Sequence, residues 1–493
     1  MELKVKFLKW SAGIPVAMLN QKTAKKLGVH VQDKISIKTL SKYPKELSTI
    51  IDTVTGLIKE DEIAVSSELH KRLELRVGQK VDVAIALNSK SLFFIKKKLD
   101  NKKLSKEEIK EIIKDIVNNS LSEAEIALFV SGMYKNGMNL KEIIYLIEAI
   151  LSSGNKLAFR SKIVGDKHSI GGIAGNRTTP IVVSICASAG IIMPKSSSRA
   201  ITTPAGTADV IETISPVEFT MKELKKIVKK TKACLIWGGA LGIVPADSKI
   251  IQVEKVLGID PEAQLLASIM SKKLAMGSKY ILIDIPYGKT AKVDKTKALK
   301  LKRKFEQLGK HFKVKLKVVL TIADEPMGSG VGPALELIDV IKILNPHEKG
   351  PEDLENKSLF LAGELLEMTK KAEKGKGIEM AKKILVSGKA FEKFKQIIEA
   401  QGGSLKEIKP AKFRKNILAK KSGRIFEIDN KKINNLARVA GCPADKFAGL
   451  YIYHNLKEKV KKREVILTIY SESKSRLNQA LKFYKDKKPI IIR

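Results

Sequence analysis

Residues 165–180 read Gly-Asp-Lys-His-Ser-Ile-Gly-Gly-Ile-Ala-Gly-Asn-Arg-Thr-Thr-Pro and open a stretch, rich in glycine, serine and threonine, that runs from 162 to 214. The glycines let the backbone approach a ligand without interference from a Cβ atom. Thr179 and Pro180 have the pattern of a helix start, an N-cap followed by proline, and the apolar residues 181–189 then end at Gly190. The sequence therefore predicts a loop that leads into a helix N-terminus.

A helix N-terminus favours an anion because its N–H groups are free and its dipole end is positive. The same stretch offers further donors for a phosphate ion, namely Lys167, Ser169, Thr178, Ser197 and Thr207. The alternative is an ordinary surface loop rich in Gly and Ser. Two hydroxyl-rich segments that meet one strand–loop–helix unit favour the anion site.

The composition sets limits on the class of protein. A chain of 493 residues predicts two to four domains. Its 92 basic against 53 acidic residues give a net charge of +39, spread through every segment. This charge could indicate nucleic-acid binding, but only 5% of residues are aromatic and no recognition motif is present. We interpret the charge as a lysine-rich solvated surface around a site for anionic substrates, and nucleic acid as an unlikely partner.

The cysteines and the hydropathy pattern predict a cytoplasmic protein. Cys186, Cys234 and Cys442 lie far apart in apolar surroundings, without the spacing of a metal site or a disulfide framework, so we expect a reducing compartment and no metal. The charged start, Met-Glu-Leu-Lys-Val-Lys, is unlike a signal peptide. No uncharged apolar run reaches membrane-spanning length, so we expect no membrane association.

Residues 1–87 predict a small β-barrel-like domain. Short β-prone runs occur at 3–7, 35–39, 62–65 and 80–86. Two similar segments, beginning at Ala24 and Leu69, each place a helical turn before a strand. This internal echo predicts a pseudo-symmetric barrel, similar to the double-psi barrel modules at the front of some archaeal enzymes and ATPases, with His30 and His70 as structural residues in the turns.

The remaining chain predicts a discontinuous helical domain, a central α/β domain and a C-terminal α+β unit, so the fold class is multidomain α/β. The helical domain is expected at 88–158 with 245–278, because capping boxes begin at Ser105 and Ser122, Asn139 begins a third helix, and Asp260 and Pro261 begin a partner helix. Strands alternating with helices place the α/β phosphate-binding domain at 159–244 with 279–412. In it we expect strands at 162–164, 191–193, 233–237, 281–285 and 317–322, and helices at 222–232, 292–308 and 333–344. The C-terminal domain, 413–493, is expected to contain strands at 423–428 and 464–470 and a helix at 473–483.

Four motifs resemble, in the same order, those of the thymidine phosphorylase family of pyrimidine nucleoside phosphorylases, over about residues 88–493. They are Lys167-His-Ser-Ile-Gly-Gly, the Ser-Ser-Arg…Gly-Thr-Ala-Asp segment at 197–209, Ser268-Ile-Met-Ser-Lys-Lys and Ala400-Gln-Gly-Gly. Val253 stands where that family carries its pyrimidine-binding arginine, and ordinary members lack the N-terminal barrel. Val253, the additional barrel and the sequence Ser-Ser-Arg-Ala-Ile-Thr together make the chain resemble the archaeal branch of the family, which acts on nucleoside 5′-monophosphates.

The resemblance implies roles for individual residues. The residues that match the family's phosphate-binding positions are Lys167, Ser169, Thr178, Ser197 and Thr207. The residues that match nucleotide-binding positions of the monophosphate branch are Gly172, Ser198, Arg199, Ala200, Ile201, Thr202, Thr203, Thr207, Ser268 and Lys292. Lys272 matches a lysine that contacts the base in the pyrimidine enzymes, a role that Val253 puts in doubt, and His168 is a second candidate base contact.

The resemblance also implies that Asp260 is the proton donor. Phosphorolysis needs a phosphate oxygen to attack C1′ while the base leaves, and protonation makes a purine a better leaving group. Asp260 could supply that proton if burial raised its pKa, but the position is equally compatible with a helix N-cap alone. Both readings remain open on the sequence.

The implied reaction is phosphorolysis of AMP, and of other nucleoside 5′-monophosphates, to free base and ribose 1,5-bisphosphate. The alternative is a pyrimidine nucleoside phosphorylase that acts on thymidine or uridine, and a third reading is a basic nucleic-acid-binding protein on a decayed enzyme scaffold. No cofactor is expected, because inorganic phosphate is a co-substrate. The resemblance further implies a homodimer or a larger homo-oligomer. The sequence does not indicate the preference among AMP, CMP and UMP.

Overall fold

The computed structural model describes residues 1–13, 15–86, 89–159, 161–405 and 407–493. The predicted boundary between the first two domains, at 87 and 88, lies outside the described residues. The chain forms two compact units, one of Met1–Ser153 with Pro245–Ser268 and one of Gly154–Val244 with Ile269–Arg493. Each unit is described separately below.

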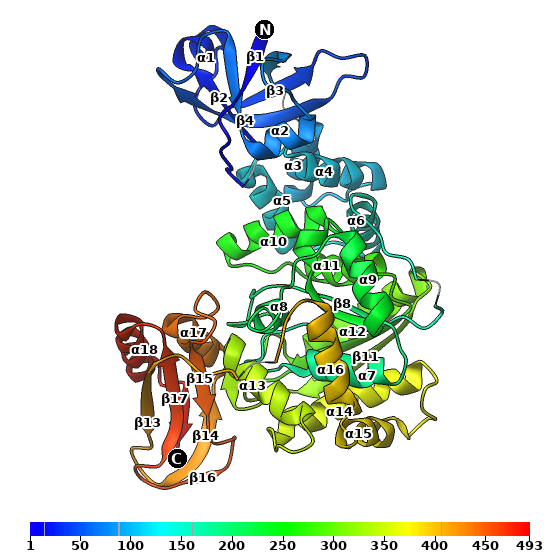
Figure 1. The fold of residues 1–493 in the computed structure, drawn as a ribbon, viewed down its shortest axis with the longest axis vertical. Coiled ribbons are helices and arrows are strands. Elements are labelled where there is room, and N and C mark those ends of the chain that lie inside the picture. The colour runs from blue at the N-terminus through cyan, green and yellow to red at the C-terminus, as the bar shows by residue number, and fades with distance from the viewer. Residues whose placement is uncertain (14, 87–88, 160, 406) are drawn as a thin grey trace. The chain divides into compact units, whose positions relative to one another are not determined.

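The first unit begins with a closed six-stranded barrel (Figure 1). Its elements in chain order are β1 Glu2–Phe7, β2 Val16–Asn20, α1 Gln21–Leu27, β3 Lys34–Thr39, β4 Glu46–Val54, β5 Glu62–Val65, α2 Ser67–Leu73 and β6 Lys80–Ile85. The strand order is β1-β5-β2-β4-β3-β6, closed by β6 against β1. The barrel consists of two halves with the same order of elements, β1-β2-α1-β3 and β4-β5-α2-β6. Exchanging β1, β2 and β3 for β4, β5 and β6 leaves the cyclic strand order unchanged, so the predicted pseudo-symmetry is confirmed. His70 lies on α2, not in a turn, and stacks on Phe7.

Helices from two separate stretches complete the first unit. They are α3 Lys90–Leu99, α4 Lys106–Asn118, α5 Glu123–Asn136, α6 Leu140–Ser152, α10 Pro245–Leu257 and the start of α11 Glu262–Ala275. Ser105, Ser122 and Asn139 all form capping boxes. Helix α10, which the sequence did not predict, packs against α4 and α5. Helix α11 begins one residue later than Pro261, the first helical position that we predicted.

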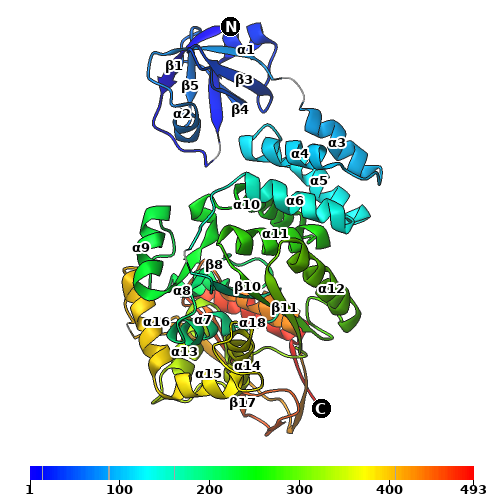
Figure 2. The ribbon, with the colours of Figure 1, turned by 90° about the vertical axis from the view of Figure 1, so that its right-hand side faces the viewer.

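Parallel strands form the centre of the second unit (Figure 2). One sheet has the order β11-β10-β7, with β7 Gly165–Ser169, β10 Tyr280–Tyr287 and β11 Lys315–Ile322. A second parallel pair is β8 Met193–Ser197 with β9 Ala233–Trp237. A bridge between Val164 and Ile192 links the two sheets. The strands predicted at 162–164 and 191–193 lie further along the chain, so Lys167 and Ser169 project from a strand and not from a loop.

Helices surround these strands. They are α7 Thr178–Ser188, α8 Thr207–Ile211, α9 Met221–Thr231, the 3-10 helix η1 Gly238–Leu241, α12 Lys295–His311, α13 Pro333–Leu344, α14 Glu352–Met368, α15 Gly377–Val386 and α16 Lys389–Ala400. The predicted N-cap at Thr179 is wrong, because α7 begins at Thr178 and its N-cap position, Arg177, makes no side-chain cap hydrogen bond. Lys292 was predicted on a helix but precedes one, since Asp294 caps α12 by accepting the N–H of Lys297 at 2.8 Å.

Two antiparallel sheets and two helices form the C-terminal segment. The first sheet has the order β12-β15-β17-β13, and the second β16-β14-β18. Their bounds are β12 Gly330–Val331, β13 Phe413–Leu418, β14 Gly423–Ile428, β15 Gly449–Ile452, β16 Lys459–Val460, β17 Val465–Ser471 and β18 Ile490–Ile492. The helices are α17 Asn430–Ala440 and α18 Lys474–Lys487, of which only the second was predicted. Because β12 comes from the loop before α13, this segment shares a sheet with the α/β part of the same unit.

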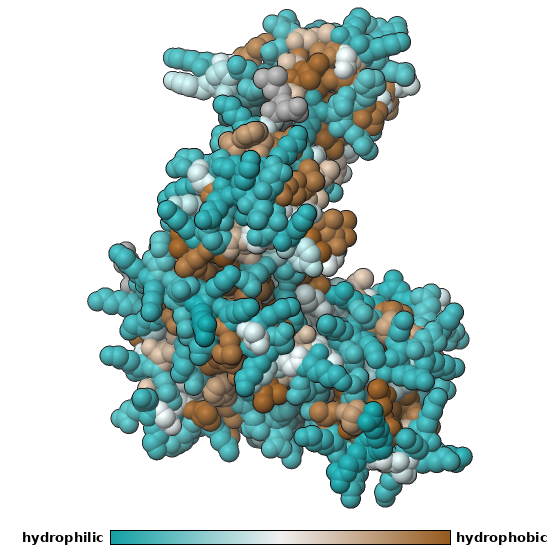
Figure 3. Space-filling view, turned by 180° about the vertical axis from the view of Figure 1, so that it is seen from behind, coloured by the Kyte–Doolittle hydropathy of each residue, from teal (hydrophilic) through white to brown (hydrophobic). Residues whose placement is uncertain are grey.

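The surface of the protein carries the excess of basic residues. Figure 3 shows hydrophilic residues over most of the face it displays, with apolar side chains in small patches. In the described part of the chain, no helix is long and apolar enough to cross a membrane. The same part of the chain holds no group of three His, Cys, Asp or Glu side chains arranged to bind a metal ion.

Gln401, from the Ala-Gln-Gly-Gly motif, supports β9 from inside the second unit. Its side chain is 2% exposed and accepts the N–H of Leu235 at 2.8 Å while donating to the carbonyl of Leu235 at 3.0 Å. We expect Gln401→Ala to lower the free energy of unfolding by about 2–4 kcal/mol, because it leaves two buried backbone groups without partners. Urea unfolding can be followed by the fluorescence of Trp237 in a Trp10→Phe background.

Gln396→Ala is the matched control, because Gln396 is exposed and bonds only with the side chain of Lys393 among the contacts found for it. Its unfolding midpoint should remain within error of the parent protein. Equal midpoints for the two variants would contradict the structural role of Gln401.

Candidate functional site

Lys167 lies at the centre of the candidate site. It projects from β7 and is 1% exposed, and its ammonium group donates to the hydroxyl of Thr178 at 2.5 Å. Thr178 is the first residue of α7, so the lysine reaches the N-terminal end of that helix. Two of the five residues expected to bind phosphate are therefore in direct contact.

Three further lysines are buried beside the carboxylates of Asp166 and Asp284. Lys195 donates to Asp166 at 3.0 Å and to the carbonyl of Lys167 at 2.7 Å. Lys273 lies 3.0 Å from the second oxygen of Asp166, and Lys357 lies 3.1 Å from Asp284. Each of these side chains is less than 10% exposed, and the whole set consists of Lys167, Lys195, Lys273, Lys357, Asp166 and Asp284. Four lysines thus share two carboxylates.

This imbalance changes the ionisation of the buried groups. Burial, helped by the positive charges of Lys357, Lys195 and Arg177 and opposed by Asp284, lowers the pKa of Lys167 to about 7. Burial also opposes ionisation of Asp284, but Lys357, Lys167 and the hydroxyl of Thr321 hold its pKa below the usual value. An anion bound near Lys167 would favour its charged form. The cluster therefore has the electrostatics of a site for a phosphate-like anion.

His168 is a neutral side chain in this environment. Burial lowers its pKa well below the usual value, and the positive charges of Lys273, Lys195, Lys272 and Lys167 act in the same direction. A histidine that is neutral at pH 7 has no proton to spare for a leaving base, although its ring can still contact one. Contact with the base, the role expected for His168, is compatible with a neutral ring.

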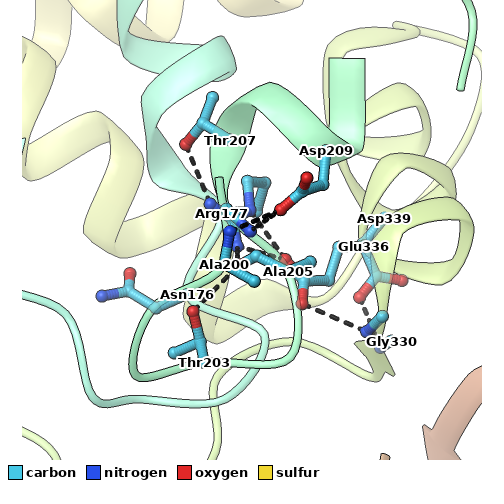
Figure 4. A network of polar contacts seen from close by, with 12 residues as sticks. Asn176, Arg177, Ala200, Thr203, Ala205, Thr207, Asp209, Gly330, Glu336 and Asp339 are labelled. Carbon is cyan, nitrogen blue, oxygen red and sulfur yellow. Dashed lines mark hydrogen bonds and ion pairs between the residues drawn. The ribbon is translucent and has the colours of Figure 1, made fainter. Parts of the chain in front are cut away.

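Arg177 joins the two halves of the glycine- and hydroxyl-rich stretch (Figure 4). Its guanidinium donates to Glu336 at 2.7 Å, to the hydroxyl of Thr207 at 2.8 Å and to the carbonyl of Ala205 at 2.8 Å. Because Arg177 and Glu336 are both buried and paired, they add no net charge to the site. Thr207, an expected ligand of both phosphate and nucleotide, is thereby fixed to the segment that precedes α7.

The loop of residues 198–206 is closed by Asp209. One oxygen of this carboxylate accepts the N–H groups of Ala200 and Gly206, each at 2.7 Å. Thr203 donates to the carbonyl of Ala205 within the same loop. Six of the residues expected to bind the nucleotide lie consecutively here, at 198–203, so a single carboxylate orders the backbone that presents them.

The glycine loop packs tightly against the other expected nucleotide residues. Gly172 has a φ of +91°, and a Cβ atom there would lie 2.8 Å from the Cβ of Lys292. A Cβ on Gly171 would lie 3.1 Å from the hydroxyl of Thr202. The structure thus brings Gly172, Lys292 and the 198–206 loop together, and only glycine allows this approach.

Ser169 and Ser197 complete the group of hydroxyls. Asn176 donates to Ser169 at 3.5 Å. The hydroxyl oxygen of Ser197 is buried and has no hydrogen-bond partner among the described residues. The hydroxyl of Ser197 is thus available to donate to a ligand.

Arg199 is already engaged by acidic side chains. It donates to both oxygens of Glu212, at 2.7 and 2.8 Å, and to Glu218 at 3.0 Å, and its guanidinium lies 4.7 Å from the ring of Trp237. These contacts raise its pKa above the usual value, chiefly through the hydrogen bond to Glu212. The carboxylates compensate its charge, so less of that charge is available to the phosphate group of a nucleotide.

Asp260 and Ser268 belong to the first unit, whereas the other expected site residues, Lys272 included, belong to the second. Asp260 is exposed and precedes α11 by one residue, Pro261. The burial on which its role as an acid was argued is thus not provided by its surroundings.

Sequence reasoning missed the charged residues beneath the site. Arg177 and Asp209 stood inside the quoted motifs, where a charged residue among glycines and threonines was a usable signal. Lys195 stood within the opening stretch and Lys273 at the end of the Ser268-Ile-Met-Ser-Lys-Lys motif, but both resemble the many surface lysines of this chain, and Lys357 lay in no motif.

Three family descriptions match the chain. Residues 93–154 match the glycosyl transferase family, helical bundle domain, and residues 161–391 match the glycosyl transferase family, a/b domain. Residues 425–490 match the pyrimidine nucleoside phosphorylase C-terminal domain. The matched regions together span most of the chain beyond the barrel.

Curated relatives match nearly the whole chain. An AMP phosphorylase of Methanococcoides burtonii is 41% identical, covering 100% of this chain and 97% of the relative. One of Thermococcus sibiricus is 42% identical over 98% and 96%. A putative thymidine phosphorylase of Legionella pneumophila (strain Corby) is 39% identical over 94% and 90%.

A solved structure, the anthranilate phosphoribosyltransferase of Thermus thermophilus, matches with a TM-score of 0.53 at 17% identity. It covers 63% of this chain and 99% of that structure. At this identity the match shows a shared fold alone.

The depressed pKa of Lys167 predicts that anion affinity depends on pH. Only protonated Lys167 attracts an anion, so above pH 7 binding must take up a proton, and affinity should fall as the pH rises. Sulfate is a suitable probe because its own charge stays constant over this range. We expect its affinity, measured by calorimetry, to fall about tenfold or more between pH 7 and pH 9.

Lys167→Met should bind sulfate weakly at pH 6 and lose most of the pH dependence. An affinity of the unmodified protein that is flat from pH 6 to pH 9 would contradict the assignment.

Proposed function

Because this chain belongs to the thymidine phosphorylase family, and within it groups with the AMP phosphorylases, we propose that it catalyses the phosphorolysis of AMP. In this reaction an oxygen of inorganic phosphate forms a bond to C1′ of the ribose. The bond between C1′ and N9 breaks, and its electron pair leaves with adenine, which takes up a proton. The products are adenine and ribose 1,5-bisphosphate, and other nucleoside 5′-monophosphates are further candidate substrates.

The observation that carries this proposal is the buried excess of lysines beside a glycine loop and the N-terminus of α7. A phosphate held there by Lys167, Ser169, Thr178, Ser197 and Thr207 would be placed by charge and by hydroxyl donors, without a metal or an organic cofactor. The same anion would stabilise positive charge that builds on the ribose in the transition state.

The nucleotide is assigned to the loops next to that phosphate. Gly172, residues 198–203, Thr207, Ser268 and Lys292 are proposed to bind AMP. This assignment is supported by the tight approach of Gly172 to Lys292 and of Gly171 to Thr202. Lys292 is the preferred candidate for the 5′-phosphate, because Arg199 is paired with Glu212 and Glu218. His168 and Lys272 are proposed base contacts.

The broader expectations from the sequence are carried here as proposals. They are the four-domain division, a homodimer or larger homo-oligomer, and a cytoplasmic location, for which the three free, buried cysteines are compatible evidence. Asp260 is proposed as the proton donor to the purine on the family resemblance.

The decisive experiment compares phosphate-dependent base release from AMP, CMP, UMP and thymidine. We expect adenine release from AMP that requires phosphate, with ribose 1,5-bisphosphate as the second product. Release from thymidine or uridine alone would support the alternative, a pyrimidine nucleoside phosphorylase. Absence of release from every substrate would contradict both.

Asp260→Asn tests the proton donor. Asparagine caps a helix about as well as aspartate, so the free energy of unfolding should change by less than about 1 kcal/mol. The amide cannot deliver the proton, so kcat for AMP should fall by about 10²–10⁴ while the KM for AMP changes little. A variant with near-normal kcat would reduce Asp260 to a structural residue. Lys292→Asn, which removes a proposed 5′-phosphate contact, should instead raise the KM for AMP.

A further inference from the structure

One face of helix α17 touches three loops of the candidate site. Asn430, Asn434 and Arg438 are spaced four residues apart, so they lie along one side of the helix. They come from the C-terminal segment, which carries none of the expected site residues. Their contacts lie within the second unit.

Asn430 and Asn434 hold the glycine loop. Asn430 accepts the N–H of Ala174 at 3.2 Å and donates to the hydroxyl of Thr290 at 3.1 Å. Asn434 donates to the carbonyl of Gly172 at 3.2 Å. Both asparagines are buried, at 0% and 4% exposure. They therefore join the glycine loop to the loop that carries Lys292.

Arg438 holds the third loop. Its guanidinium donates to the carbonyl of Ile201 at 2.7 Å and to that of Thr203 at 3.3 Å. These carbonyls belong to the same loop in which Asp209 accepts the backbone N–H groups of Ala200 and Gly206. Arg438 is itself exposed. Its replacement should therefore disturb the loop without removing any part of a core.

We propose that Asn430, Asn434 and Arg438 are positioning residues, through which the C-terminal segment orders the loops that bind the nucleotide. Each makes backbone or hydroxyl contacts that fix a loop, and none needs to touch the substrate. Six consecutive candidate nucleotide residues sit on this loop, and Arg438 holds two of their backbone carbonyls, so loss of Arg438 removes both contacts while those of Asp209 remain. The consequence for catalysis rests on the proposed function, whereas the ordering of the loops does not.

The test uses the full-length protein with Arg438→Ala and two readouts. Hydrogen–deuterium exchange should become faster in residues 198–206, because two carbonyl contacts are lost. The KM for AMP should rise about 3- to 10-fold, the effect of losing about one net hydrogen bond, while the KM for phosphate changes less than about twofold. Arg438→Lys can still donate to one carbonyl, so it should recover part of both effects.

Arg476→Ala is the matched control, because Arg476 is a surface arginine of α18 whose guanidinium pairs with Asp445 at 2.9 Å and not with the backbone of these loops, among the described residues. It should alter neither readout. A second variant, Asn434→Ala, should speed exchange in residues 170–177 instead of 198–206. The Arg438→Ala variant is the decisive one, because Arg438 is exposed and its replacement leaves the core intact.

The outcomes separate this inference from the proposed function. Unchanged exchange in residues 198–206 of Arg438→Ala overturns the inference, whatever the substrate proves to be. Faster exchange with an unchanged KM for AMP also overturns it, because the ordered loop would then not serve the nucleotide. Faster exchange in a protein whose parent releases no base from AMP supports the ordering role and contradicts the proposed function alone.

Discussion

A surplus of buried positive charge is the constraint on which the second unit depends. Lys167, Lys195, Lys273 and Lys357 lie in the interior, and in the part of the chain that the structure describes their buried acidic partners are Asp166 and Asp284. A buried charge without a partner is costly, and its pKa shifts until the cost falls. The lowered pKa of Lys167 is an example of such a shift. A bound dianion would compensate the positive charge and so raise this pKa again.

The fold places this charge where an anion can use it. Strand β7 carries Asp166 and Lys167 on successive positions, so their side chains point to opposite faces of the sheet. Asp166 draws Lys195 and Lys273 to one face, while Lys167 reaches Thr178 and the N-terminus of α7 on the other. The glycine loop then connects the strand to the helix, and its glycines allow the close approach of Thr202 to Gly171 and of Lys292 to Gly172.

The sequence predicted the parts of this arrangement that are local. The glycines at 171, 172 and 175 and the hydroxyls at 178 and 207 form recognisable motifs, and the strand at 233–237 and the helix at 333–344 were predicted with the observed bounds. Proline at the start of an apolar run misled the prediction for α7, because the helix begins at Thr178, whose hydroxyl accepts a hydrogen bond from Lys167. Lys357 and Asn434 approach the site from elements more than 150 residues away in sequence. No local pattern distinguishes them from neighbouring lysines and asparagines.

The central claim is that Lys167 is neutral for part of the time until an anion binds. Lysine labelled with ¹³C and ¹⁵N, with the resonance assigned by comparison with Lys167→Arg, allows its pKa to be measured by NMR titration with and without phosphate. The account predicts a pKa of about 7 without phosphate and an increase of at least about two pH units when phosphate is saturating. A pKa near the ordinary lysine value of about 10.4, unchanged by phosphate, would contradict it.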